Sequence, residues 1–428
     1  MGHMHRVRHV LMVVVAGSLL AAACGGDDDS EASSGGDGAL DTGNEEIRAV
    51  PDEYDTIQAA VDAAEPGDLV LVSPGVYKEA VTVTTDDLVI RGLDRNEVIL
   101  DGEFEKDNGI RVVEADGVAI ENMTARNYTT NGFYWITAER YRGSYLTAYN
   151  NGDYGIYAFD STVGLFEHSY GSGSPDAGFY IGQCFPCDAV IDDVVAENNG
   201  LGYSGTNAGG DLYIVNSTFR QNRAGVVPNS GSYEKDYPER ETTIVGNLVY
   251  SNNNYETAAI DAARMAGGNG ILVAGGNDNV IERNQVWDHD VTGIAVVLVP
   301  DDEVGVFWPT GNEVQDNVVS DSRLADLGVS DEEGAGNCFA GNEFSTTAPT
   351  DLETLMPCSG TGTGDRTAGA LDVLRLGSLD DKPPSADYKD QPPPDDQENM
   401  PDADSAPWEK AGDPPTVDVD AIETPEKP

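Results

Sequence analysis

The sequence predicts an all-β protein built as a parallel β-helix, in which the chain winds into stacked coils of about 23 residues. Short strands rich in β-branched and aromatic residues alternate with Gly, Asn and Asp turns, and the segments between them are too short for helices. A second turn signature, as in Asn-Leu-Val-Tyr-Ser-Asn at 247–252, runs out of phase with a glycine repeat. Leucine-rich repeats of similar length are the alternative, but leucine is scarce at the repeat positions. The repeat glycines, spaced by 23, 23, 23, 24, 23, 45 and 23 residues, are Gly109, Gly132, Gly155, Gly178, Gly202, Gly225, Gly270 and Gly293.

The N-terminus is predicted to be an export signal. Arg6 and Arg8 precede an eleven-residue apolar run that is too short to span a bilayer, and residues 21–23 are alanines followed by Cys24. A small-residue run ending on cysteine resembles a bacterial lipobox. This resemblance implies that a signal peptide, residues 1–23, is removed and that Cys24 carries a lipid anchor at the outer face of the cytoplasmic membrane. The alternative is plain secretion with a free cysteine. Residues 24–49 are rich in Gly, Ser and Asp and are predicted to be a disordered tether.

A short helix is predicted to close the N-terminal end of the solenoid, within a β-helix domain over residues 50–358. Residues 54–83 include Thr-Ile-Gln-Ala-Ala-Val at 56–61, Pro-Gly-Asp at 66–68 and Pro-Gly-Val-Tyr at 74–77. They resemble the cap and first coil of the pectate-lyase-like right-handed β-helix superfamily, a resemblance that covers residues 50–325. It implies a right-handed solenoid whose open end is covered by Ile57, Val61 and Ala64. The superfamily includes lyases, hydrolases, epimerases, esterases, adhesins and copper-delivery proteins, so the fold alone names no activity.

The recurring Asn at the turns has a structural explanation. Asn tolerates left-handed backbone, and its amide can bond to the Asn one coil above, so that a column of them forms a ladder. His289 occupies this register, and we interpret it as a member of the ladder. The alternative is a catalytic acid or base whose imidazole is oriented by Asp288 and Asp290.

Four cysteines follow the signal region, and an even number in an exported chain suggests disulfides. Proximity in the sequence pairs Cys184 with Cys187 and Cys338 with Cys358. A zinc or redox site at Cys184 and Cys187 is the alternative, but no second CxxC, His pair or thioredoxin-like context accompanies it.

Insertions locate a candidate cleft. The distance from a repeat glycine to the next turn signature is usually 13 to 15 residues, but it is 22 after Gly225 and 24 after Gly293. Inserts at 228–240 and 300–311 should therefore leave the same edge of the solenoid, whereas a third insert at 255–268 leaves another edge. Insertions stacked on one face commonly border a binding site.

The inserts carry side chains suited to an acidic sugar polymer, because aromatic faces suit sugar C–H surfaces and cations suit carboxylates. The alternative is that these loops only pack on the solenoid wall. The candidate catalytic groups are Lys235, Arg240, His289, Asp288 and Asp290, and the candidate substrate-binding groups are Arg220, Arg223, Tyr233, Tyr237, Phe307 and Trp308.

The C-terminal segment, residues 359–428, holds 11 of the 22 prolines and many aspartates, so we predict a disordered tail. The chain carries 76 acidic and 24 basic residues, a formal net charge of −52, and residues 48–358 alone have 51 acidic and 16 basic residues. This balance argues against a nucleic-acid partner, since phosphate binding needs a basic face.

Two hypotheses of function remain from the sequence. The first is a lipid-anchored envelope protein that acts on an extracellular polysaccharide, as a lyase or C5-epimerase of a uronate polymer. The second is a non-catalytic envelope protein that binds a glycan or a partner, or that only presents a rigid surface. The Gly-His-Gly and Arg-x-Lys motifs of polygalacturonase-like hydrolases and the Asp-Phe-Ile-Phe-Gly signature of pectin methylesterases are absent. Alginate-active members of the superfamily are similar only loosely, around 287–290. Acidic residues are plentiful enough for calcium, and no cofactor is otherwise indicated. Copper delivery is disfavoured because only two histidines, His168 and His289, follow the predicted signal peptide. A monomer is expected.

Overall fold

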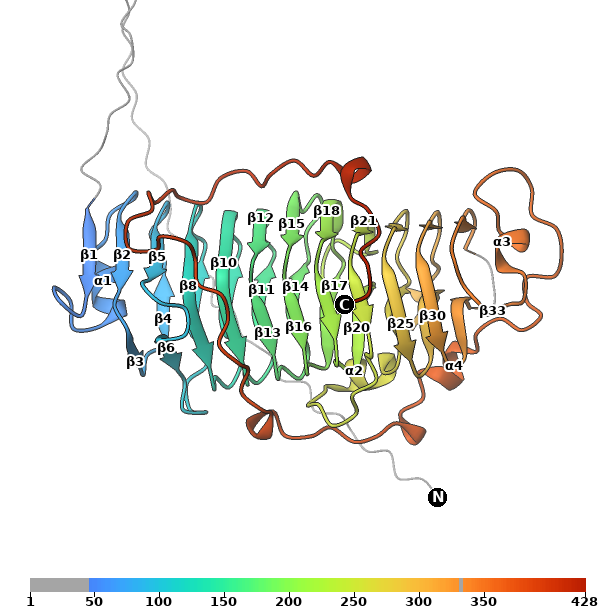
Figure 1. Ribbon diagram of the computed structural model, residues 1–428, viewed down its shortest axis with the longest axis horizontal. Helices are drawn as coiled ribbons and strands as arrows, with labels where there is room; N and C mark the ends of the chain where they lie inside the picture. Colours follow the sequence, from blue (N-terminus) through green and yellow to red (C-terminus); the bar gives the residue numbers. More distant parts are fainter. Residues whose placement is uncertain (1–45, 331–333) are drawn as a thin grey trace, which may run out of the picture. The chain divides into compact units, whose positions relative to one another are not determined.

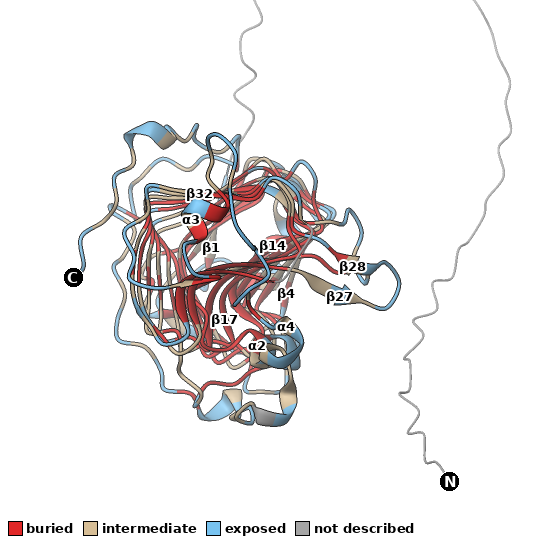
Figure 2. Ribbon diagram, turned by 90° about the vertical axis from the view of Figure 1, so that its right-hand side faces the viewer, coloured by how far each residue is buried: buried red, intermediate tan, exposed pale blue. Residues whose placement is uncertain are grey.

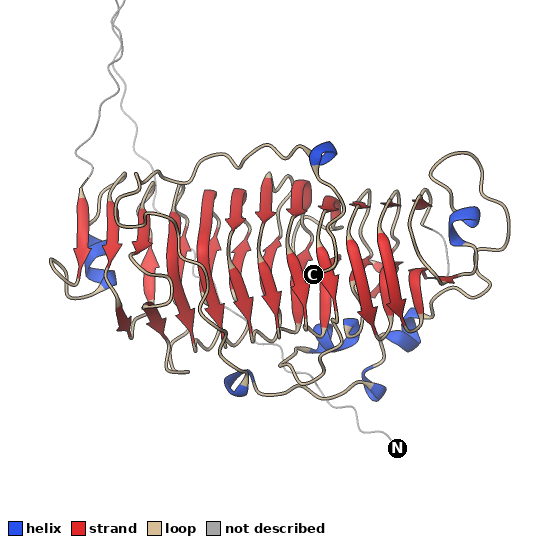
Figure 3. Cartoon of the chain, in the orientation of Figure 1, coloured by secondary structure: helices blue, strands red, loops and turns tan. Residues whose placement is uncertain are grey.

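A computed structural model describes residues 46–330 and 334–428, so that the predicted signal peptide, Cys24 and most of the tether lie outside the described residues. Parallel strands stack coil on coil along the long axis (Figure 1), and the few short helices lie at the ends and along the edges of the stack (Figure 3). The predicted parallel β-helix is confirmed. The predicted tether ends earlier than expected, because Ile47–Val50 forms strand β1, which pairs with β2.

Each complete coil runs through three faces of the solenoid, and strands of successive coils stack on each face. Face 1 is the separate eleven-stranded sheet; faces 2 and 3 adjoin at a tight turn, and strands β8 and β10 bend through it and serve both. Face 1 contains β4 (Val81–Val83), β7 (Ile110–Val113), β9 (Phe133–Ile136), β11 (Ile156–Phe159), β14 (Ala177–Gly182), β17 (Leu201–Thr206), β20 (Ala224–Asn229), β23 (Ile271–Ala274), β26 (Thr292–Val297), β31 (Ala325–Val329) and β33 (Thr347–Ala348).

The other two faces follow face 1 in every coil. Face 2 contains β1, β2 (Leu69–Val72), β5 (Val89–Gly92), β8 (Ala119–Arg126), β10 (Glu139–Tyr149), β12 (Thr162–Glu167), β15 (Ala189–Asp192), β18 (Gly209–Val215), β21 (Arg240–Val245), β24 (Val280–Glu282), β29 (Glu313–Gln315) and β32 (Cys338–Ala340). Face 3 contains β3 (Gly75–Tyr77), β6 (Val98–Asp101), the ends of β8 and β10, β13 (Tyr170–Ser172), β16 (Val195–Glu197), β19 (Thr218–Arg220), β22 (Leu248–Tyr250), β25 (Gln285–His289) and β30 (Val318–Ser322).

The glycine repeat sets the register of face 1. Ile156, which follows Gly155, pairs with Phe133 on one side and Phe179 on the other, so equivalent repeat positions lie one above another. A Cβ atom on Gly155 would lie 2.6 Å from the carbonyl oxygen of Gly178 in the next coil. Only glycine lets adjacent coils approach this closely, which is why it recurs once per coil.

A continuous apolar core fills the solenoid (Figure 2). Inward-facing side chains alternate with outward-facing ones along each strand, as in Phe133 and Trp135 of β9, both buried. Helix α1 (Ile57–Ala63) covers the N-terminal end as predicted, with Ile57 and Val61 in the core, although Ala64 is only half-buried against it. Helix α3 (Leu352–Leu355) contributes Leu352 and Leu355 to the core beside the last coils.

The predicted ladder and disulfides are present. Asn247, Asn284 and Asn317 lie at the turn between faces 2 and 3, where the backbone N–H of each donates to the side-chain oxygen in the next coil, at 3.0 Å for the first pair and 2.9 Å for the second. These bonds satisfy polar groups that the turn buries. The pairings Cys184–Cys187 and Cys338–Cys358 are both confirmed.

The C-terminal strap, residues 382–428, runs in an extended path along the solenoid (Figure 1), with only short turns η2 (Tyr388–Asp390) and η3 (Val419–Ala421). Arg91, Arg95 and Arg223 are buried and donate hydrogen bonds to strap carbonyl oxygens, for example Arg91 to Ala406 at 2.8 Å. Strap residues also cover an apolar stripe on face 2. This arrangement differs from the disordered tail that its composition predicts, because composition does not count the solenoid groups that the strap binds.

Candidate functional site

The inserts meet beside face 1 as the loop lengths predict. The backbone N–H and the hydroxyl of Ser232 both donate to Asp301, at 3.1 and 2.9 Å, and Tyr237 meets Phe307 edge to face with ring centroids 5.7 Å apart. The second of these inserts forms the hairpin β27 (Val299–Asp301) and β28 (Gly305–Phe307). The third insert forms α2 (Asp261–Ala266), which packs against the opposite ends of the face 1 strands. Face 1 therefore has a raised wall along each edge.

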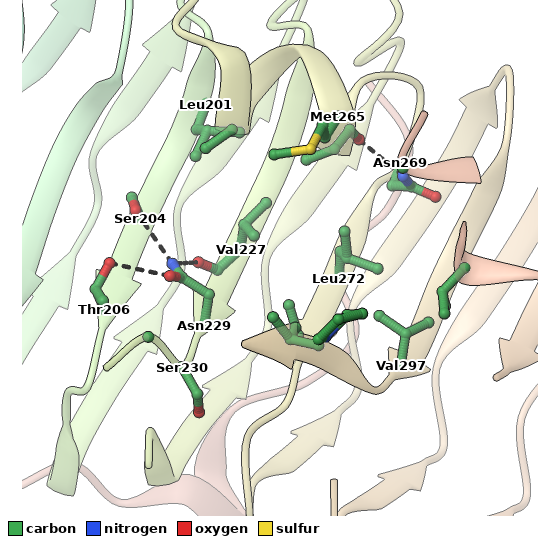
Figure 4. A pocket seen from close by; sticks show the side chains of 18 of the residues that line it. Leu201, Ser204, Thr206, Val227, Asn229, Ser230, Met265, Asn269, Leu272 and Val297 are labelled. Carbon is green, nitrogen blue, oxygen red and sulfur yellow. Dashed lines mark hydrogen bonds between the residues drawn. The ribbon is translucent and has the colours of Figure 1, made fainter. Parts of the chain in front are cut away.

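A cavity of about 550 Å³ lies between these walls, with the outer surface of face 1 as its floor (Figure 4). This volume is in the range of sites that hold small molecules or a few sugar units. Helix α4 (Val373–Leu376) adds part of a wall at the end nearest the last coils. Of the residues that the sequence singled out, Tyr233 lines the cavity.

Tyrosines from successive coils form an aromatic surface that leads into the cavity. Tyr134, Tyr157 and Tyr180 pair directly in the sheet and alternate with core residues, so their rings point outward from face 1; Tyr134 and Tyr157 are half-buried there, whereas Tyr180 is fully buried. Tyr154 stacks on Tyr157 with centroids 4.3 Å apart, and Tyr157 contacts Tyr180 at 4.7 Å. Such a run of rings offers flat apolar surface with polar edges, which suits the faces of sugars.

Two carboxyl groups are hydrogen-bonded to this surface. The hydroxyl of Tyr154 donates to Asp176 Oδ2 and that of Tyr180 to Glu234 Oε2, both at 2.8 Å. Burial disfavours the ionised form and raises the pKa of Asp176 to about 7 and that of Glu234 to about 7. No basic side chain among the described lining residues of the cavity offsets this effect. Near neutral pH, these groups are poised to take up or release a proton. We call Tyr154, Tyr157, Tyr180, Asp176 and Glu234 the tyrosine–carboxyl cluster.

The basic residues between 220 and 240 do not gather at the cavity. Arg220 lies on face 3, where it pairs with Glu197 at 2.6 Å, and buried Arg223 binds the strap. The Arg240 guanidinium lies 3.5 Å from the ring centroid of Phe185, and it donates to the carbonyls of residues 236 and 238. Lys235 is exposed, and its Nζ lies 3.1 Å from Asp160. The grouping expected from the sequence reflects their spacing along the chain, since the coil sends consecutive residues to different faces.

His289 lies in an Asn ladder and not in the cavity. Its Nε2 is 3.4 Å from Nδ2 of Asn252, the ring is buried, and burial lowers its pKa to about 3. Asp288 accepts a hydrogen bond from Ser251 on face 3, and neither Asp288 nor Asp290 lines the cavity. The structural interpretation of His289 therefore fits its surroundings, whereas a buried neutral imidazole is badly placed for proton transfer to a polymer.

The aromatic residues of the inserts divide between packing and exposure. Phe307 is buried, Tyr237 packs on it, and Trp308 is about one-third exposed but does not line the cavity. Phe307 and Tyr237 thus pack within the wall beside the cavity, which agrees with the alternative interpretation that the inserts pack on the solenoid.

The outward position of the tyrosines follows from their spacing in the sequence. Tyr134, Tyr157 and Tyr180 each stand two residues after a repeat glycine, which the strand alternation turns outward on face 1. No comparable signal identified Asp176 or Glu234, because Glu234 reaches Tyr180 only through the fold of its insert.

Within 46–330 and 334–428, no three His, Cys, Asp or Glu side chains gather in a way that would hold a metal ion. No helix in the same part of the chain has the length and apolar character needed to cross a membrane.

Comparisons with known proteins agree on the fold. The family model described as "Right handed beta helix region" matches residues 95–297. The mannuronan C-5 epimerase AlgE4 A-module of Azotobacter vinelandii is similar, with a TM-score of 0.52, 17% identity, and coverage of 72% of this chain and 95% of that chain. The AlgE6 A-module of the same organism has a TM-score of 0.48 and 18% identity, covering 68% and 93%. Pectate lyase Pel9A has a TM-score of 0.42 and 15% identity, covering 77% and 82%.

No curated protein matches the sequence. At these identities the structural likeness concerns the fold, and the chain has a right-handed parallel β-helix fold.

Proposed function

We propose that the protein binds an extracellular polysaccharide along the tyrosines of face 1 and processes it in the cavity by proton transfer. The tyrosine–carboxyl cluster carries this proposal. Sugar rings would stack on Tyr134 and Tyr157, and the reacting sugar would lie between Asp176 and Glu234. The similar solved structure that is named a mannuronan C-5 epimerase supports a sugar polymer as the substrate class.

The chemistry that suits this cluster is removal and return of a proton. Because both carboxyl pKa values lie near 7, one group can be ionised and act as base while the other is protonated and acts as acid. In a uronate polymer, the acidic proton is next to the sugar carboxylate; its removal leads either to elimination or to re-protonation on the other face. We therefore propose a lyase or C5-epimerase of a uronate polymer, in which the exposed Lys235, which follows Glu234 in the chain and pairs with Asp160, would bind the sugar carboxylate.

Incubation of the full chain with alginate, pectate, glycosaminoglycans and uncharged glycans tests the proposal. We expect one uronate polymer either to gain ultraviolet absorbance from unsaturated ends or to change its epimer ratio by NMR. Absence of binding to all of these polymers would overturn the proposed function.

Non-catalytic binding is the second candidate. It is favoured by the fact that both carboxyls already accept hydrogen bonds from tyrosine hydroxyls. Binding of a polymer without any turnover, unchanged by Asp176→Asn, would support this candidate over the enzyme.

We also propose that the protein is exported and anchored by a lipid on Cys24, supported by the sequence of its first 24 residues. Labelled fatty acid should be incorporated by cells making the natural chain and lost with Cys24→Ser. Equal labelling of both chains would contradict the anchor at this residue.

A further inference from the structure

The cavity has two chemically different ends (Figure 4). Its floor is the outer surface of face 1, where one column of side chains changes character along the solenoid. Tyr180 pairs with Ser204 and Ser204 with Val227, so the column turns apolar over two coils. It continues as Leu272 and Ala295, which pair directly. Thr206 and Asn229 stand beside this column at the polar end.

Apolar walls enclose the aliphatic end of the cavity. Leu371 forms a bridge with Ser330 beyond the last complete strand, and Val373 and Leu376 of α4 pack against a buried cluster that includes Ala295 and Val297. On the opposite edge, α2 and its preceding residue contribute Met265 and Ile260. These walls come from an insert and from the segment after the last coil. The aliphatic end of the cavity is therefore an addition to the repeating solenoid. Its lining residues are Val227, Leu272, Ala274, Ala295, Val297, Leu371, Val373 and Leu376.

Charge is confined to the other part of the cavity. The ionisable side chains among the described lining residues belong to the tyrosine end or to the mouth, as with Asp176, Glu234 and Asp301, and none of the lining residues is Lys, Arg or His. A sugar hydroxyl placed against Leu272 and Val297 would lose its hydrogen bonds to water without replacement. The aliphatic end therefore fits hydrocarbon and does not fit a further sugar unit of a chain.

We propose that the aliphatic end binds an acyl chain attached to the sugar that occupies the tyrosine end, so that the natural ligand is an acylated glycan. The inference rests on the proposed function for the sugar part. It is carried independently by the continuity of the two ends within one cavity of about 550 Å³. Flexible Met265, which is partly exposed at the wall, suits a chain of variable length.

Calorimetric titration of the full chain with methyl, butyl, hexyl and octyl glucosides, all below micelle formation, tests the acyl site. We expect affinity to rise two- to fourfold for each added methylene. Leu272→Gln should weaken the binding of octyl glucoside at least tenfold. Ala274→Leu, which fills the aliphatic end without adding polarity, should weaken it by the same factor. Ile136→Gln is the matched control, because Ile136 is a half-buried residue on the same outer surface that does not line the cavity.

The outcomes separate this inference from the proposed function. Equal affinity for all chain lengths, with polysaccharide processing intact, would overturn the acyl site and leave the proposed function standing. A chain-length dependence removed by both cavity variants but not by Ile136→Gln supports the acyl site. The same dependence in a protein that binds no polysaccharide would overturn the sugar part of the proposal. A dependence unchanged by both cavity variants would overturn the site, provided that melting temperatures show all variants to be folded.

Discussion

A chain that ends at residue 381, without the C-terminal strap, should melt roughly 5 to 10 °C below the full chain. The strap covers two apolar clusters on face 2: Trp408 and Ala411 lie on one around Leu69, and Val417 and Ile422 lie on the other around Val190. Removing the strap would expose the contiguous apolar surface of face 2 to water. The shortened chain should also bind a hydrophobic dye more strongly than the full chain.

A chain that ends at residue 424 provides the control, because it keeps both apolar contacts and removes only four exposed or half-buried residues. We expect its melting temperature to match that of the full chain. If the chain ending at residue 381 also melts unchanged and binds no more dye, then the strap contributes nothing to stability and the composition-based prediction of a disordered tail is the better description.

Replacing either carboxyl of the tyrosine–carboxyl cluster should reduce turnover of the polymer about 100-fold or more, since general acid–base groups contribute effects of this size. Asp176→Asn and Glu234→Gln keep the shape and the acceptor oxygen for Tyr154 or Tyr180 but can no longer exchange a proton. The measurement is the rate of turnover of whichever uronate polymer the wild-type chain processes in the incubation described under Proposed function. The melting temperature should show that both variants are folded.

The dependence of turnover on pH gives an independent check. Both pKa values are raised to about 7, so below about pH 6 both groups are protonated and the base is lost. Above about pH 8 both are ionised and the acid is lost, so activity should peak near neutral pH. Glu313→Gln, which changes an exposed carboxyl of face 2, is the control and should keep the natural rate and profile. Full activity in both cluster variants would exclude the proposed role.

The edge from which each insert leaves was predictable because a solenoid converts sequence spacing into position. Each coil repeats the same order of faces, so an insert at a given phase of the 23-residue repeat leaves a known edge. The contact between Ser232 and Asp301, 69 residues apart, follows from that rule. The same rule placed the outward tyrosines one above another, although their spacing from the repeat glycines was not used.

The composition of the inserts was a poor guide to the site. Arg220, Arg223 and Arg240 are close in sequence, but Arg220 lies on face 3, Arg223 binds the strap, and Arg240 begins β21 on face 2 and lies over Phe185. Nothing in the sequence distinguishes Asp176 and Glu234 from the many other acidic residues, because they differ from those only in their burial beside tyrosine hydroxyls. Burial of a particular carboxyl depends on which loops cover it, and no local pattern records this.

The sequence alone determined the parallel β-helix and its insert edges, because a periodic pattern specifies contacts between equivalent positions of neighbouring coils. Its two disulfides followed from proximity in the sequence, and its cap from the resemblance of residues 54–83. Only the tertiary structure decided which side chains share the cavity, the raised pKa values of Asp176 and Glu234, and the course of the strap along the outer faces. These features depend on contacts between segments that are not repeats, such as residues 371–377 against face 1, and no periodicity relates such segments to one another.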